Sequence, residues 1–189
     1  MKGESHKLLG RYLIQQYLEQ APRRYSKAFL IGCIEPDRNP ATYLKGSIRS
    51  QFLRGHNWGN SQRYMFRLGR RLENRKRLRL LDFYTLGKLI HYTTDAFTYA
   101  HNEEFEENLK QHNAYELDLQ NYFLNLRTGG LDANYAPGTS VTETIQKYHQ
   151  DYSQAPVDRN TDISFAVSVC SAVFHQLLSR HGQAILAFC

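Results

Sequence analysis

The stretch between residues 91 and 116 carries two histidine–acid pairs at the same spacing. His91 and Asp95 are four residues apart, and so are His112 and Glu116. On a helix, this spacing offsets two side chains by only ~40° and ~6 Å, so both can reach one cation. Imidazole nitrogens and carboxylate oxygens are ligands that zinc prefers. Two such pairs on neighbouring helices therefore predict a metal site.

His101 lies between these two pairs. On an unbroken helix its Cα atom would be ~15 Å from that of His91, which is too far for a compact site. We therefore expect the helix to end or kink after Asp95, where β-branched threonines at 93, 94 and 98 weaken it. Asp95 would then lie between two histidines and be suited to bridge two metal ions.

The elements that must position these residues are expected to be helices. Apolar residues recur at spacings of three and four, and alternating strand patterns are nearly absent, so an all-α fold is predicted. Helices are expected at 5–20, 24–33, 58–73, 81–98, 103–126, 139–153 and 161–186, with the prolines in the gaps. The long connection 34–56 contains Asp37 and ends at His56. A length of 189 residues fits one domain, 1–189.

Composition and motifs exclude several classes of protein. With 41% hydrophobic and 22% charged residues, the chain has ordinary globular composition. Neither a glycine-rich phosphate loop nor a Gly-x-Ser-x-Gly elbow is present, which excludes the common nucleotide-binding and serine-hydrolase patterns. No apolar run reaches signal-peptide length at the N-terminus or the ~18–20 residues of a membrane span. A cytoplasmic location is expected, or secretion if a leader preceded this chain.

The net charge of +6 is concentrated between residues 63 and 79. Eight basic residues in this stretch face a single acid, Glu73. Such density predicts contact with phosphate groups of nucleic acid or anionic lipid. The alternative is a solvated helix face. The prediction of contact with phosphate groups rests on Arg63, Arg67, Arg70 and Arg71.

These residues resemble the zinc-dependent phospholipase C family, whose helical fold is shared with single-strand-specific zinc nucleases. The family pattern His-Tyr-x-x-Asp-x5-His, followed by His-x3-Glu, is similar to the chain from His91 to Glu116. Phe29 to Asp37 resembles an apolar helix running into Gly-x3-Pro-Asp, and Ser5-His6 resembles an early Thr/Ser-His. His56, just before Trp58, matches a further histidine.

The resemblance implies a ligand role for several of these side chains. One zinc would be held by His56, His91 and Asp95, and a second by His101, His112 and Glu116. Asp37 would act beside the metal-bound water as general base or positioning carboxylate. Two zinc ions are thus expected. A third, held by His6 and Asp95, is left open, because family members contribute an N-terminal tryptophan there and this chain begins with Met1-Lys2.

One further departure concerns the turn before the third motif histidine. Family members commonly carry a proline two residues before it, and this chain has Tyr99. The leading hypothesis is a zinc-dependent phosphodiester hydrolase of phospholipase C type, acting on a phosphate ester that is either a phospholipid head group or nucleic acid. The alternatives are a single-strand nuclease on the same fold and a non-catalytic, zinc-stabilised binding protein. The histidines that lack acidic neighbours are expected to be structural or exposed; they are His149, His175 and His181.

Overall fold

The computed structural model describes residues 1–39, 56–102, 108–126 and 136–186. Within these ranges the regular elements are helices and no strand occurs, which confirms the all-α prediction. The α-helices are α1 (Gly3–Tyr17), α2 (Arg23–Arg38), α3 (Trp58–Glu73), α4 (Leu80–Ala96), α5 (Leu109–Asn125), α6 (Val141–Tyr152) and α7 (Arg159–Leu186). A short 3₁₀ helix, η2 (Tyr99–His101), follows α4.

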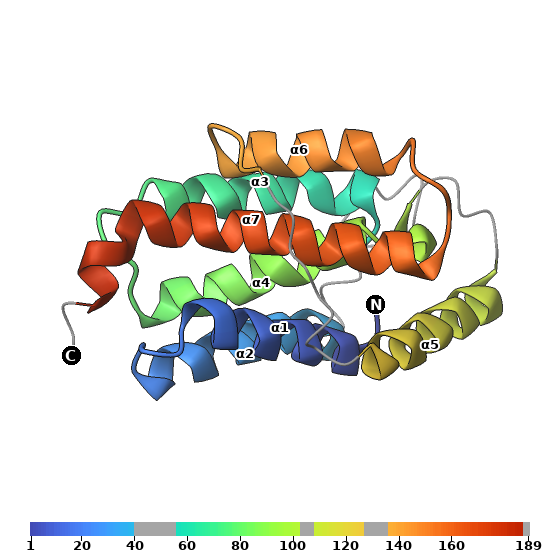
Figure 1. The fold of residues 1–189 in the computed structure, drawn as a ribbon, viewed down its shortest axis with the longest axis horizontal. Helices are drawn as coiled ribbons and strands as arrows, with labels where there is room; N and C mark the ends of the chain where they lie inside the picture. The colour runs from blue at the N-terminus through green and yellow to red at the C-terminus, as the bar shows by residue number, and fades with distance from the viewer. Residues whose placement is uncertain (40–55, 103–107, 127–135, 187–189) are drawn as a thin grey trace.

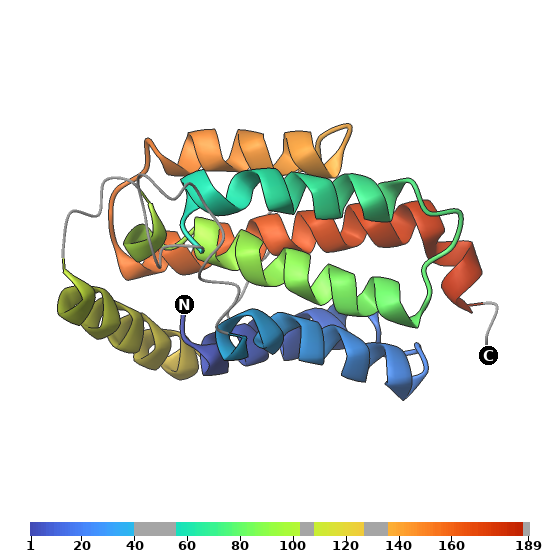
Figure 2. The ribbon, with the colours of Figure 1, turned by 180° about the vertical axis from the view of Figure 1, so that it is seen from behind.

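Helix α4 is the centre of the bundle. It contacts α1, α2, α3 and α7, and every residue from Leu89 to Ala96 is buried. Helices α1 and α2 lie on one side of α4, whereas α3 and α6 lie on the other, and α7 runs along the length of the bundle (Figures 1 and 2). The side chains of α4 therefore reach elements from both halves of the chain.

Two glycines allow α2 and α4 to approach each other closely. A Cβ atom on Gly32 would run into the backbone carbonyl of Tyr84, and one on Gly87 would run into that of Phe29. Because neither residue has a side chain, the two backbones come near enough for His91 Nδ1 to lie 2.9 Å from the carbonyl oxygen of Cys33. The crossing thereby holds the His91 ring in place beside the end of α2.

The end of α2 differs from the sequence prediction. We expected a helix over 24–33 with Pro36 and Asp37 in a connection, but α2 continues to Arg38 and contains Pro36. Pro36 lies in the last turn, so its missing N–H and the clash of its ring with the carbonyl four residues earlier disturb only the end of α2, which stops two residues later. Asp37 is therefore a helical residue. The rest of the expected 34–56 connection, residues 40–55, lies outside the described residues.

Helix α4 ends where the threonines predicted a break. After Ala96 the chain turns into η2, and polar side chains donate hydrogen bonds to backbone carbonyls in and just after the last turn of α4. Thr98 Oγ1 donates to the Thr94 carbonyl at 3.1 Å, and Asn102 Nδ2 donates to the Ala96 and Thr98 carbonyls at 3.1 and 2.9 Å. The break lets His101 fold back towards Asp95.

Helix α7 corrects one expectation about membrane-length segments. Its stretch Arg159–His181 is long and apolar enough to cross a membrane by length and composition, although we had expected no such stretch. In the fold, 61% of that window is buried against other elements. Its apolar composition is thus accounted for by packing in the core of the bundle.

Candidate metal centre

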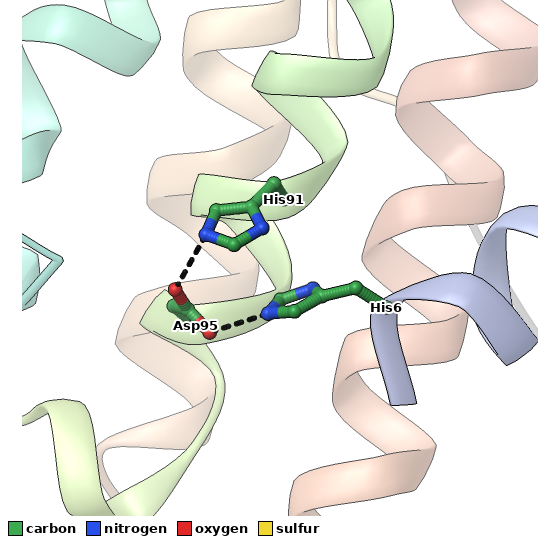
Figure 3. Close-up of side chains that lie close together, drawn as sticks. All are labelled: His6, His91 and Asp95. Atoms are coloured by element: carbon green, nitrogen blue, oxygen red, sulfur yellow. Dashed lines mark ion pairs between the residues drawn. The ribbon is translucent and has the colours of Figure 1, made fainter. Parts of the chain in front are cut away.

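Asp95 lies at the centre of a cluster of histidines. Its Oδ2 atom is 3.1 Å from His56 Nδ1 and 3.2 Å from His91 Nε2. Its Oδ1 atom is 3.1 Å from His6 Nε2, so the carboxylate lies between His6 and His91 (Figure 3). The Asp95 side chain is fully buried. The two oxygens of one carboxylate thus face two different groups of nitrogens, as a bridging carboxylate would.

Asp37, His56 and His91 form the first group of donor atoms around Asp95. His91 Nε2 is 3.3 Å from His56 Nδ1, and Asp37 Oδ1 is 3.6 Å from His91 Nε2 and 3.8 Å from His56 Nδ1. Ligands at the ~2.0–2.1 Å typical of zinc lie about 3.3 Å apart at the corners of a tetrahedron. The separations within this group are close to that spacing, so these side chains fit a zinc ion.

His101, His112 and Glu116 form a second group on the other side of Asp95. Glu116 Oε1 is 3.0 Å from His101 Nε2 and 3.7 Å from His112 Nε2, and His101 Nε2 is 3.8 Å from Asp95 Oδ1. Two of these residues come from α5 and one from η2. The family resemblance implied that these three side chains hold one zinc ion, and the structure brings them together.

His6 and the backbone of Met1 complete the cluster. The His6 ring stacks on that of His91 with centroids 3.9 Å apart. The Met1 amino nitrogen lies 2.6 Å from Asp95 Oδ1 and 2.9 Å from Glu116 Oε1, and the Met1 carbonyl oxygen lies 3.1 Å from His6 Nε2. The family resemblance led us to expect a difference here, because the first side chain is not tryptophan. The groups that reach the cluster, however, are the backbone amine and carbonyl of Met1, and methionine has these as tryptophan does.

The electrostatics of the cluster favour a bound cation. Burial alone would raise the pKa of Asp95, but the Met1 ammonium and the imidazoles of His101, His6 and His91 hold it well below its usual range. Burial would lower the pKa of the Met1 amine, yet Asp95 and Glu116 raise it to about 11. Burial and the nearby Met1 ammonium lower the pKa of His101 to about 4. Asp95 thus stays charged and His101 stays neutral, the state in which both bind metal.

Unused donor atoms in the cluster give a direct test of fit. Three buried atoms of the cluster's side chains have no hydrogen-bond partner within the described part of the chain: His6 Nδ1, Asp37 Oδ2 and His101 Nδ1. In the same residue ranges no lysine or arginine forms an ion pair with the cluster's carboxylates. Buried carboxylates are costly without a compensating charge. The Met1 ammonium supplies one positive charge beside Asp95 and Glu116, and Asp37 adds a third carboxylate to the cluster. A divalent cation would neutralise the remaining negative charge, and the histidine–carboxylate set suits zinc.

Asp162 supports the cluster from α7 and was missed by the sequence analysis. Its buried carboxylate accepts hydrogen bonds from Tyr152 Oη at 2.6 Å, Tyr115 Oη at 2.8 Å and the Tyr99 backbone N–H at 3.0 Å. Family members commonly have a proline at the position of Tyr99, and proline has no backbone N–H. The N–H of Tyr99 needs an acceptor, and Asp162 provides it. From sequence, Asp162 is indistinguishable from an ordinary acid in the first turn of a helix.

His149 holds two segments of the site together. Its ring stacks on Trp58 with centroids 3.6 Å apart, and its Nε2 lies 2.9 Å from Asn102 Oδ1. Trp58 follows His56 by two residues and Asn102 follows His101, so His149 ties together the two segments that carry these histidines. The other two histidines without acidic neighbours, the exposed His175 and the buried His181, lie outside the metal groups. This agrees with the structural or exposed roles predicted for all three.

Comparison with known proteins supports the family resemblance. Residues 5–177 match the family model described as zinc-dependent phospholipase C, which covers most of the chain. No curated protein and no solved structure matches at the threshold applied. The matched range contains all eight histidine and acidic residues of the cluster, as well as Asp162 on α7 and His149 on α6. The chain therefore belongs to the zinc-dependent phospholipase C family.

Proposed function

We propose that this protein hydrolyses phosphodiesters in the manner of a phospholipase C, with zinc bound in the cluster around Asp95. The observation that carries the proposal is the position of Asp95, whose two oxygens each face a separate group of histidines. The family match supports zinc dependence and hydrolase chemistry. The residues that would hold zinc are His56, His91, Asp95, His101, His112 and Glu116, with His6 at a third position.

Bound zinc would lower the pKa of a coordinated water and neutralise charge on a phosphodiester. The chain's own residues fix where this happens. Cys33 accepts a hydrogen bond from His91 Nδ1, which leaves Nε2 free to face the cluster. The Asp95 carboxylate holds both groups of nitrogens at a fixed separation.

Asp37 is the residue that we assign to the reacting water. It is the most exposed of the three clustered carboxylates, with 21% of its side chain accessible, whereas Asp95 is fully buried. Its Oδ2 is buried and has no hydrogen-bond partner within the described residues, so a proton or a bound water would satisfy it. Asp37 is also close enough to His56 and His91 to serve as a ligand, so its role needs a direct test.

Zinc content tests the metal assignment. Plasma emission spectrometry of the purified, zinc-reconstituted protein should find about two zinc ions per chain, or about three if the His6 position is filled. Absence of zinc after reconstitution would contradict the proposal. Hydrolysis of a choline phosphodiester and of single-stranded DNA, measured side by side, then separates a phospholipase C from a nuclease.

Asp37→Asn tests the catalytic assignment. Asparagine keeps the shape of the side chain but cannot take a proton, so turnover should fall about 100-fold or more while zinc content and Tm change little. Loss of zinc in this variant would instead make Asp37 a ligand. The control is Asp118→Asn, on the exposed face of α5 and paired with Arg159, which should keep wild-type turnover. Zinc-loaded wild type without turnover on either substrate would indicate a binding protein.

A further inference from the structure

Helices α2, α4 and α3 form one layer with α4 in the middle (Figure 2). Lys88 of α4 marks the outer face of this layer. Its Nζ atom is 2.9 Å from Glu35 Oε2 on α2. Burial lowers the pKa of Lys88, but the hydrogen bond to Glu35 and the nearby Tyr64 of α3 outweigh burial and raise this pKa above its usual value. The three residues therefore lie on one surface that spans the three helices, which we call the α2–α4–α3 face.

Helical periodicity extends this face away from the metal centre. Residues three, four, seven or eleven positions apart lie on the same side of a helix. Counting back from Glu35 and Lys88, and forward from Tyr64, this relation selects both buried and accessible residues. Gly32, Thr85 and Leu68 are buried, and the accessible ones include Arg24 and Ile31 on α2, Leu81 and Tyr84 on α4, and Arg67 and Arg71 on α3.

The acids of these three helices are already neutralised. Glu35 pairs with Lys88, Asp82 pairs with Arg75 at 3.1 Å, and Glu73 lies 3.5 Å from Arg180. Asp37 and Asp95 belong to the metal cluster. The exposed arginines Arg67 and Arg71 are thus an excess of positive charge on the face.

Two aliphatic side chains are exposed among these charges. Leu81 is 73% exposed and Ile31 is 60% exposed. Exposed leucine and isoleucine gain little from a nucleic acid, whose bases are bound by stacking on aromatic rings. They do gain from entering the acyl boundary of a bilayer, where flanking arginines meet anionic head groups.

From this combination we infer that the α2–α4–α3 face docks onto an anionic phospholipid bilayer. The face ends at the metal centre, since Asp37 and His91 follow Glu35 and Lys88 by two and three residues on the same helices. Docking here would keep the cluster close to the bilayer surface. Binding does not need turnover, so the inference can fail or hold separately from the hydrolytic function.

Vesicle sedimentation tests the inference. Zinc-loaded protein is mixed with vesicles of equal parts phosphatidylcholine and phosphatidylglycerol, or of phosphatidylcholine alone, and lipid phosphorus is assayed afterwards to show that the vesicles are intact. Binding to the anionic vesicles should be at least tenfold stronger and should weaken with salt. The double variant R67E/R71E should lose about tenfold of that binding, and Leu81→Ser about fivefold.

Matched controls come from other exposed helices. The charge reversal K110E/K147E, on α5 and α6, and Leu124→Ser, on α5, should bind within about twofold of wild type. Unfolding curves of all variants should stay near that of wild type because the altered side chains are exposed. Equal binding to both vesicles, no effect of R67E/R71E, or tighter binding to single-stranded DNA with no effect of Leu81→Ser would each overturn the inference.

Discussion

Asp162 connects three segments that carry or adjoin metal-site residues. Tyr99 precedes His101 by two residues, Tyr115 precedes Glu116, and Tyr152 ends α6, the helix of His149. All three donate hydrogen bonds to one buried carboxylate. Because Asp162 forms no contact with the donor atoms themselves, its role is to position them. A residue of this kind influences the site without being part of the chemistry.

Asp162→Asn should lower the free energy of unfolding by about 2 kcal/mol, because the amide accepts with only one oxygen and leaves a buried donor unpaired. Burial raises the pKa of Asp162 above its usual value, and the hydrogen bonds from Tyr152, Tyr99 and Tyr115 offset only part of that rise. Below that raised value and above about 4, the folded chain holds a proton that the unfolded chain lacks. The wild type therefore gains stability relative to the variant as the pH falls through this window.

Urea unfolding of both proteins at pH 7 and at about pH 4.5 checks this prediction. The difference between wild type and variant should be larger at the lower pH. Asp151→Asn, an exposed substitution on α6, should change stability by less than about 0.5 kcal/mol. A difference that stayed constant or shrank on acidification would contradict the raised pKa.

At the scale of elements, the contact between α2 and α4 decides whether the first donor group can form. His56 comes from the segment before α3, His91 from α4 and Asp37 from α2, so their separations depend on the distance between helices. Gly32 and Gly87 set that distance by leaving no side chain at the crossing. Asp37 Oδ1 on α2 thereby lies 3.6 Å from His91 Nε2 on α4.

Gly87→Ala should lower the free energy of unfolding by about 3 kcal/mol and weaken zinc binding, because its Cβ would push against the Phe29 carbonyl and separate the two helices. Thermal unfolding and zinc titration of the variant measure both effects. The control is Leu80→Ala, at the exposed start of the same helix and away from the crossing, which should leave zinc affinity unchanged. A stable Gly87→Ala protein with unchanged zinc affinity would show that the crossing is not limiting.

At the scale of the whole molecule, the cluster gathers residues from Met1 to Glu116, which is more than half of the chain. Met1 and His6 approach Asp95 from one end of the chain, and Glu116 approaches from α5. Folding thus brings the carboxylates of Asp95 and Glu116 close together, on either side of the Met1 ammonium. A cation bound between them would tie α1, α4 and α5 to one another as well as supply chemistry.

Zinc removal should therefore destabilise the protein. A ligand at a thousand times its Kd stabilises the fold by about 4 kcal/mol, which corresponds to roughly 10 °C in Tm for a chain of this length. Calorimetry before and after chelation, with zinc added back, measures the change. Asp95→Asn should show a much smaller shift, because the residue shared by both groups is altered. Equal Tm values with and without zinc would contradict a metal that links these helices.

By itself, the sequence determined the helical class, the histidine–acid pairs and the break after α4. These are local properties, because side chains four residues apart share a helix face wherever the helix lies. Pro36 showed the limit of local rules, since burial of α2 against α4 carried the helix through it to Arg38. Only the tertiary structure decided that Asp37 meets His91, that the Met1 backbone reaches Asp95, and that Asp162 supports η2. Those contacts join residues distant in the chain, and their geometry follows from how helices pack rather than from spacing.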